Sequence, residues 1–144
     1  MNATNNLSHD PPQALRYEGV HCTLYIECVA PQVIVMTIAG SDIGEFGDAP
    51  MLALQAWLQP GSETELYIDA RAARGASVDV SSEWGRWLAR NKSALRRVTM
   101  LTGSRFVQIT AEFVRRFADL GGMMRICTEA AVFDAALSEA RRWR

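Results

Sequence analysis

The side chains of this sequence that could do chemistry gather around a serine pair in its middle. An apolar segment, residues 65–70, ends near the acid Asp69, and the hydroxyls of Ser81 and Ser82 come just before a helical pattern. A helix start has free backbone N–H groups, which favour anions. The spacing therefore predicts a site at the carboxyl edge of a sheet, where open α/β folds usually bind their ligands.

Charged residues accompany the serines. The first 70 residues carry nine acids and one base, whereas residues 71–105 carry eight bases and two acids, one of which is Asp79. Arg74 precedes the serines, and Arg86 and Arg90 fall on the helix expected after them. This basic patch could bind an acidic partner, and a solvated helix face is the alternative interpretation. Because the basic face lacks aromatics suited to stacking on bases, we expect no nucleic acid as a partner.

Two further turns are expected at the same edge as secondary candidates. One contains Ser41 and the other contains Ser104 and Arg105, and neither stretch is a phosphate-binding glycine motif. The two histidines, His9 and His21, lack the neighbours of a catalytic triad or of a metal site. We therefore expect no enzyme activity, no metal and no cofactor.

Alternating strands and helices must position these residues. The hydrophobic periodicity predicts strands over residues 21–29, 33–39, 65–70, 97–103 and 123–128, and helices over 51–58, 82–95, 107–120 and 130–142. The first two strands form a hairpin, and the later strands pair in parallel through right-handed crossovers. The prediction is an α/β fold with a mixed five-stranded sheet and four helices, in the order β-β-α-β-α-β-α-β-α.

The spacing of apolar residues also predicts which face of each helix is buried. For the third helix the expected inner residues are Ile109, Phe113, Phe117 and Leu120. For the last helix they are Val132, Phe133, Ala136, Leu137 and Ala140. In the helix over 82–95, one serine could act simply as the N-cap, a role worth about 1 kcal/mol. We expect Ser77 to lie in the loop before it.

Length and composition limit the organisation of the chain. With 144 residues, of which 49% are hydrophobic, it fits one domain over residues 17–144, preceded by a flexible polar arm over residues 1–16. No apolar run approaches the roughly 20 residues of a membrane span, and no secretory signal is evident, so we expect a cytoplasmic protein. The strand over 21–29 is an edge, so either the arm or a second copy of the chain should cover it.

At this point the chain resembles the STAS family, the anti-sigma-factor-antagonist-like or SpoIIAA-like domains. The resemblance covers about residues 17–137 and rests on the element order and on the stretches 66–69, 78–82 and 97–103. In the family turn a serine follows Asp directly and a glycine follows the Ser/Thr pair. Here Val80 intervenes and Glu83 replaces the glycine.

The resemblance implies a regulatory protein-protein interaction module without catalysis, in a bacterial signalling pathway with a kinase-like or other signalling partner. It also implies phosphorylation at Ser81 or Ser82, with Asp79 and Asp69 beside them. For the exposed edge strand, independently of the resemblance, we expect either a homodimer or a monomer whose edge is covered by the arm.

A carrier or sensor of a small apolar, lipid-like ligand is the alternative function. STAS-like relatives also resemble lipid-binding folds, and methionine side chains adapt well to the shape of a ligand. The methionines that could line such a cavity are Met36, Met51, Met100, Met123 and Met124.

Overall fold

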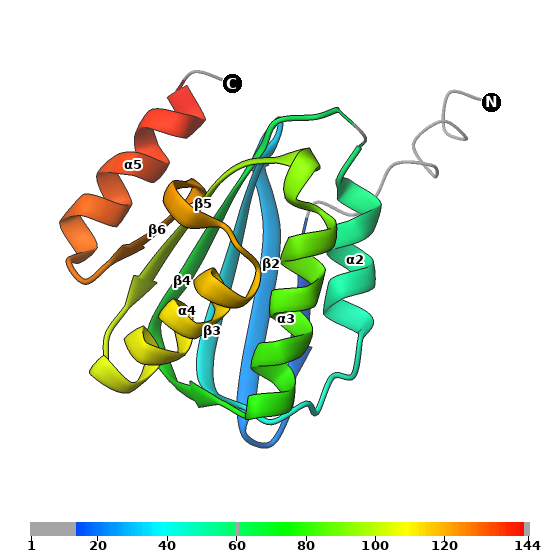
Figure 1. The fold of residues 1–144 in the computed structure, drawn as a ribbon, viewed down its shortest axis with the longest axis vertical. Helices are drawn as coiled ribbons and strands as arrows, with labels where there is room; N and C mark the ends of the chain where they lie inside the picture. The colour runs from blue at the N-terminus through cyan, green and yellow to red at the C-terminus, as the bar shows by residue number, and fades with distance from the viewer. Residues whose placement is uncertain (1–13, 60, 143–144) are drawn as a thin grey trace.

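The computed structural model describes residues 14–59 and 61–142, which form one mixed sheet with helices packed on both faces (Figure 1). The strands are β1 (Ala14–Glu18), β2 (Cys22–Ala30), β3 (Val33–Asp42), β4 (Thr64–Ala76), β5 (Leu95–Thr102) and β6 (Met124–Cys127). Their order in the sheet follows the chain, β1-β2-β3-β4-β5-β6. Strand β2 pairs antiparallel with both β1 and β3, and the neighbouring strands from β3 to β6 pair in parallel.

Four α-helices connect and follow the parallel strands, as predicted. They are α2 (Ala49–Trp57), α3 (Val78–Arg90), α4 (Arg105–Phe117) and α5 (Ala130–Arg142), with the short 3-10 helices η1 (Lys92–Ala94) and η2 (Gly121–Met123) between them. The α/β class and the hairpin before the parallel strands are therefore confirmed.

The number of strands differs from the prediction, since the sheet has six strands and not five. The additional strand, β1, includes residues 14–16 of the expected arm. Leu15 and Tyr17 alternate with polar residues and lie opposite Ile26 and Leu24 of β2, a pattern too short to stand out next to the polar segment before it. Residues of the arm thus cover the edge of β2, and residues 1–13 of the predicted arm lie outside the described residues.

The turn between β1 and β2 is fixed to the segment before α2 by one carboxylate. Glu45 accepts hydrogen bonds from the backbone N–H groups of Val20, at 2.7 Å, and of His21, at 3.0 Å. Desolvation raises the pKa of Glu45, but these two donors and the His21 side chain outweigh it and leave the pKa below its usual value. The nearby Cys22 is buried, which together with Asp42 and Glu45 raises the pKa of its thiol to about 11.

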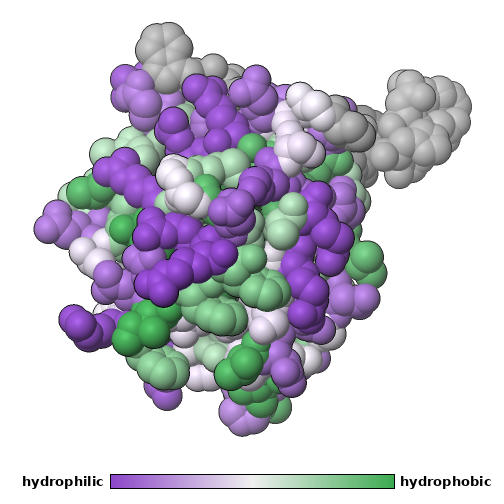
Figure 2. Space-filling model, viewed as in Figure 1, coloured by the Kyte–Doolittle hydropathy of each residue, from purple (hydrophilic) through white to green (hydrophobic). Residues whose placement is uncertain are grey.

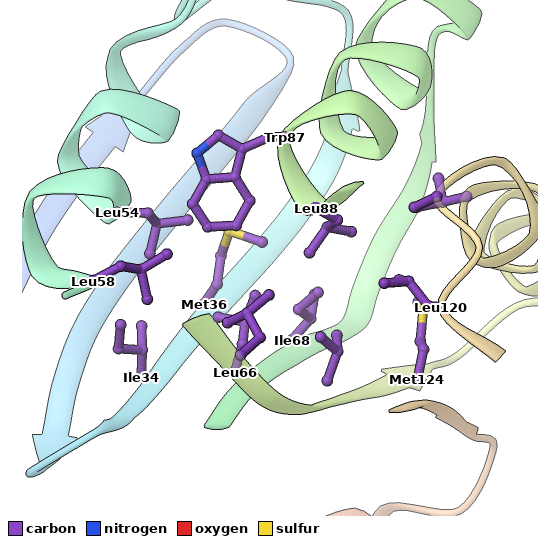
Figure 3. Close-up of a cluster of buried hydrophobic side chains, with 14 of the residues drawn as sticks. Ile34, Met36, Leu54, Leu58, Leu66, Ile68, Trp87, Leu88, Leu120 and Met124 are labelled. Atoms are coloured by element: carbon purple, nitrogen blue, oxygen red, sulfur yellow. The ribbon is translucent and has the colours of Figure 1, made fainter. Parts of the chain in front are cut away.

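Two apolar clusters hold the layers together. The larger cluster packs α2, α3 and α4 against one face of the sheet, with the ring of Trp87 between Leu54 and Leu88 and next to Met36 (Figure 3). The smaller cluster joins the other face to α5. There the rings of Phe133 and Tyr67 pack edge to face, with their centroids 5.9 Å apart. The predicted inner residues of α5 are confirmed, because Phe133 and Ala140 are buried and Val132, Ala136 and Leu137 pack against them.

The central strand β4 is longer than its apolar pattern predicts. It continues past Ala70, where pairing with β5 ends, and follows β3 as far as Ala76. The β3–β4 register shifts twice, and the first shift, between Asp69 and Ala72, turns the strand so that Ala73 is buried on the same side as Ala70. The predicted loop after residue 70 is therefore strand, and α3 begins at Val78 instead of Ser82.

Candidate functional site

The start of α3 is capped by Ser77, not by Ser81 or Ser82. The Ser77 hydroxyl oxygen accepts the backbone N–H of Val80 at 3.2 Å, and the backbone of Ser77 is extended, as at an N-cap. Ser77 lies between β4 and α3, as the loop prediction expects, but its capping role was not predicted. Asp79 in the first helical turn is the sequence signal that could have indicated it.

The two predicted serines lie inside α3 and differ in exposure. Ser81 is only 6% exposed, and its hydroxyl donates to the Ser77 carbonyl at 2.9 Å. Ser82 is half-buried, while Asp79 in the first turn is exposed. Of the pair, Ser82 is thus the one that a partner or a modifying enzyme could reach.

The predicted arginines lie at the surface. Arg86 and Arg90 follow Ser82 along α3, and Arg74 lies on the extended part of β4. All three are exposed, and none forms an ion pair with another residue in the part of the chain that the structure describes. Their charges are therefore available to an incoming group.

Asp69 does not join the serines. Arg71 donates to the Asp69 carboxylate at 2.9 Å and to Asp134 of α5 at 3.0 Å, so Asp69 lies on the α5 face of the sheet. Its neighbours in β4, Ile68 and Ala70, face α3 and α4 instead. The hydrogen bond with Asp69, opposed by desolvation and assisted by Asp134, raises the pKa of Arg71.

The secondary candidates do lie at the predicted carboxyl edge. Ser104 caps α4 by accepting the Val107 N–H at 3.0 Å, and Arg105 next to it is exposed. Ser41 is half-buried near the end of β3, where the Ser77 N–H donates to the Asp42 carbonyl at 2.9 Å. Ser41 and Ser104 therefore lie at the same edge of the sheet as the start of α3.

The outer face of α4 carries a row of exposed apolar side chains, which we call the aromatic ridge. Its members and their exposed fractions are Phe106 64%, Ile109 60%, Phe113 47% and Phe117 46%. Three of them were predicted to face the core, and that prediction was wrong. The smaller residues Val107, Ala111 and Val114 are buried in their place, while Leu120, beyond the helix, is buried as predicted.

The position of the ridge follows from close contact between α3 and α4. A side chain at Gly85 of α3 would collide with the ring of Phe117, so the lack of one lets this ring lie against the helix. Phe113 stacks on Phe117 with ring centroids 5.8 Å apart. Figure 2 shows apolar surface over α4 and beside α3, bordered by hydrophilic side chains.

A cavity of about 100 Å³ lies beneath these two helices, between them and the sheet. Met36, Met100 and Met124 contribute to its wall, as the sequence predicted for a ligand cavity. Met51 and Met123, which were predicted to join them, pack against the larger apolar cluster and do not line this cavity.

Over residues 14–59 and 61–142, no group of three His, Cys, Asp or Glu side chains could hold a metal ion. No helix within these segments is long and apolar enough to cross a membrane.

The antiparallel hairpin, the parallel strands after it and the alternating helices define a STAS-like fold. A solved structure described as the anti-sigma factor antagonist SpoIIAA in its unphosphorylated form has this fold, with a TM-score of 0.52 and 17% sequence identity over 80% of this chain and 96% of that chain. No protein-family model and no curated protein matches the sequence.

Proposed function

We propose that this protein is a non-catalytic regulatory module that binds a protein partner through the outer surface of α3 and α4. The observation that carries the proposal is the aromatic ridge, because its side chains lie in solvent although their size and apolarity favour burial. The fold shared with an anti-sigma factor antagonist supports a regulatory role. The pathway we propose is a cytoplasmic signalling pathway of bacteria.

The chemistry of this surface favours a partner segment that is apolar and acidic. Aromatic residues and arginine are enriched at the centres of protein interfaces, where they account for most of the binding energy. Here the ridge lies on α4, and α3 beside it carries Arg86 and Arg90 without ion pairs among the described residues. An amphipathic helix with acidic residues along its edges would match both features.

Phosphorylation of Ser82 is the switch that we propose for this surface. Ser82 is more accessible than Ser81, whose hydroxyl is already bound to the Ser77 carbonyl. Arg86 lies one helical turn after Ser82, so a phosphate there could pair with its guanidinium. That pairing would withdraw Arg86 from an acidic partner, and a kinase-like protein would be the modifying partner.

Replacement of Ile109 by Asp tests the partner surface. Ile109 is 60% exposed on the ridge, and Leu52 on α2 is a matched control at 63%. Tagged wild type and both variants are used to isolate bound proteins, which are quantified by mass spectrometry. We expect at least a tenfold loss of one specific partner with Ile109→Asp and none with Leu52→Asp. Equal recovery by all three proteins would overturn the proposed surface.

The switch is tested separately on the captured partner. We expect Ser82→Asp and Arg86→Glu to weaken its binding while the melting temperature stays near that of the wild type, since both positions lie at the surface of α3. Full binding by both variants would reject the switch but leave the ridge as the binding surface.

A further inference from the structure

The cavity under α3 and α4 is a second feature that the proposed partner surface does not explain. Its lining residues run along β3 from Asp42 at the end of the strand to Met36 nearer its middle. Its roof comes from both helices, including Trp84 of α3 and Ala111 of α4. The cavity therefore reaches the carboxyl edge of the sheet.

The wall of the cavity suits an apolar molecule. Aliphatic and sulfur-containing side chains from β3, β4 and β5 form its floor, among them Met36, Ile68 and Met100. Methionine has several rotatable bonds, so these side chains can move to fit the shape of a guest. Apolar cavities of comparable size, about 150 Å³, stay dry and take up benzene, so the volume of about 100 Å³ suits one ring or a short alkyl chain.

The polar groups on the wall act as acceptors toward a ligand. The Ser81 hydroxyl donates its hydrogen bond to the Ser77 carbonyl at 2.9 Å, and the Thr110 hydroxyl donates to the Phe106 carbonyl at 3.2 Å. Toward a ligand, both hydroxyls can therefore act only as acceptors, through their oxygen lone pairs. Asp42 also lines the cavity, and one oxygen of its carboxylate accepts the Gly44 N–H at 3.0 Å. No Lys or Arg side chain lines the cavity within the described residues.

We infer that this cavity binds a short alkyl or aromatic molecule whose polar end is a hydrogen-bond donor, an alcohol or a primary amine. The apolar part lies between the helices and the sheet, and the donor lies near Asp42 and Ser81, which are both hydrogen-bonded to Ser77. A carboxylate of the same chain length binds less well, because its charge meets acceptors and the like charge of Asp42. This site is independent of the aromatic ridge, which lies on the outer face of α4.

Methionine methyl resonances in the wild-type protein give a direct test. The probes are 1-hexanol, hexylamine and hexanoate, each titrated into protein labelled with ¹³C at the methionine methyl groups. We expect hexanol and hexylamine to shift the signals of Met36, Met100 and Met124, while Met51, which does not line the cavity, stays in place. Hexanoate should bind at least tenfold more weakly. Unchanged cavity methionines, or equal shifts at Met51, would overturn the site.

Two neighbouring alanines of β4 provide a matched pair of variants. Ala73 is buried and lines the cavity, whereas Ala72 is exposed. Ala73→Leu should fill the cavity and weaken hexanol binding at least tenfold, while Ala72→Leu should leave it unchanged. Equal affinities of the two variants would contradict the inference. If Ala73→Leu does not fold, the wild-type titration still decides.

The head-group preference is tested with Asp42→Asn, which keeps an acceptor for the Gly44 N–H but removes the charge. The preference for hexylamine over hexanoate should fall at least tenfold in this variant. An unchanged preference would show that Asp42 does not select the ligand, and equal binding of hexylamine and hexanoate by the wild type would reject the proposed ligand class.

Discussion

Helices α4 and α5 have the same length, 13 residues, and lie on opposite faces of the same sheet, yet they relate to the core in different ways. In α5 the largest apolar side chain, Phe133, is buried at 1% exposure. In α4 the large apolar side chains face outward, and Ala111 is among the small ones that face the sheet. The same kind of amphipathic pattern thus marks a core face in one helix and an external face in the other.

Helical periodicity therefore identifies an apolar stripe on a helix but does not say what covers it. Along α4 there are two stripes, a small one formed by Val107, Ala111 and Val114 and a large one formed by the aromatic ridge. The residues of the inner stripe are small, and they face the sheet where α4 packs beside α3. A helix with more apolar surface than its own fold buries is the kind of element that binds another molecule.

The largest expected effect separates the two helices directly. Phe133→Ala in α5 should lower the free energy of unfolding by about 3–5 kcal/mol, because it leaves a cavity in a fully buried position. Phe113→Ala in α4 should cost less than about 1 kcal/mol, since this ring is already 47% exposed. Urea denaturation of the two variants and the wild type measures both values, and similar losses would mean that the ridge is part of the core.

A second test concerns the contact that sets the position of the ridge. Gly85→Ala should destabilise the protein by about 1–2 kcal/mol, because the added methyl group collides with the ring of Phe117. In a Phe117→Ala background the same change should stabilise it by about 1 kcal/mol, since alanine favours helix over glycine. A double-mutant cycle gives the coupling, and additive effects would show that α3 and α4 do not meet through this ring.

The smallest effect concerns the start of α3, next to α4. Ser77→Ala should cost about 1 kcal/mol through loss of the cap on the Val80 N–H. Ser82→Ala should stay within about 0.5 kcal/mol, because its side chain has no capping role in the structure. Thermal unfolding of both variants measures these losses of stability. A larger loss for Ser82→Ala than for Ser77→Ala would mean that Ser82 caps the helix, as one reading of the sequence predicted.

Much of the architecture could be read from the sequence because turn residues separate its elements. The range of α5 was predicted at both ends, and α2 begins with Pro50 in its first turn, as expected. The end of β4 was missed because its last residues are small or charged, and they follow β3 through two bulges that no periodicity of two can represent.

The candidate site was predicted in outline but not in detail. Ser41, which lies in β3 instead of the predicted turn, and Ser104, the N-cap of α4, do lie at the carboxyl edge of the sheet. The early end assigned to β4 moved the expected helix start to Ser82 and hid the capping role of Ser77. Asp69 was placed with the serines although strand alternation directs it to the opposite face, where Arg71 and Asp134 hold it.

The short strands at the two borders of the sheet bear on how copies of this protein could associate. The described outer strands, β1 and β6, have 5 and 4 residues, whereas the inner strands have between 8 and 13. A brief border offers few backbone groups to a neighbouring chain, and the β1 border also carries the charged pair Arg16 and Glu18. These borders disfavour a continuous sheet across two copies, so a homodimer of this protein would associate through side chains on its helices rather than through backbone pairing.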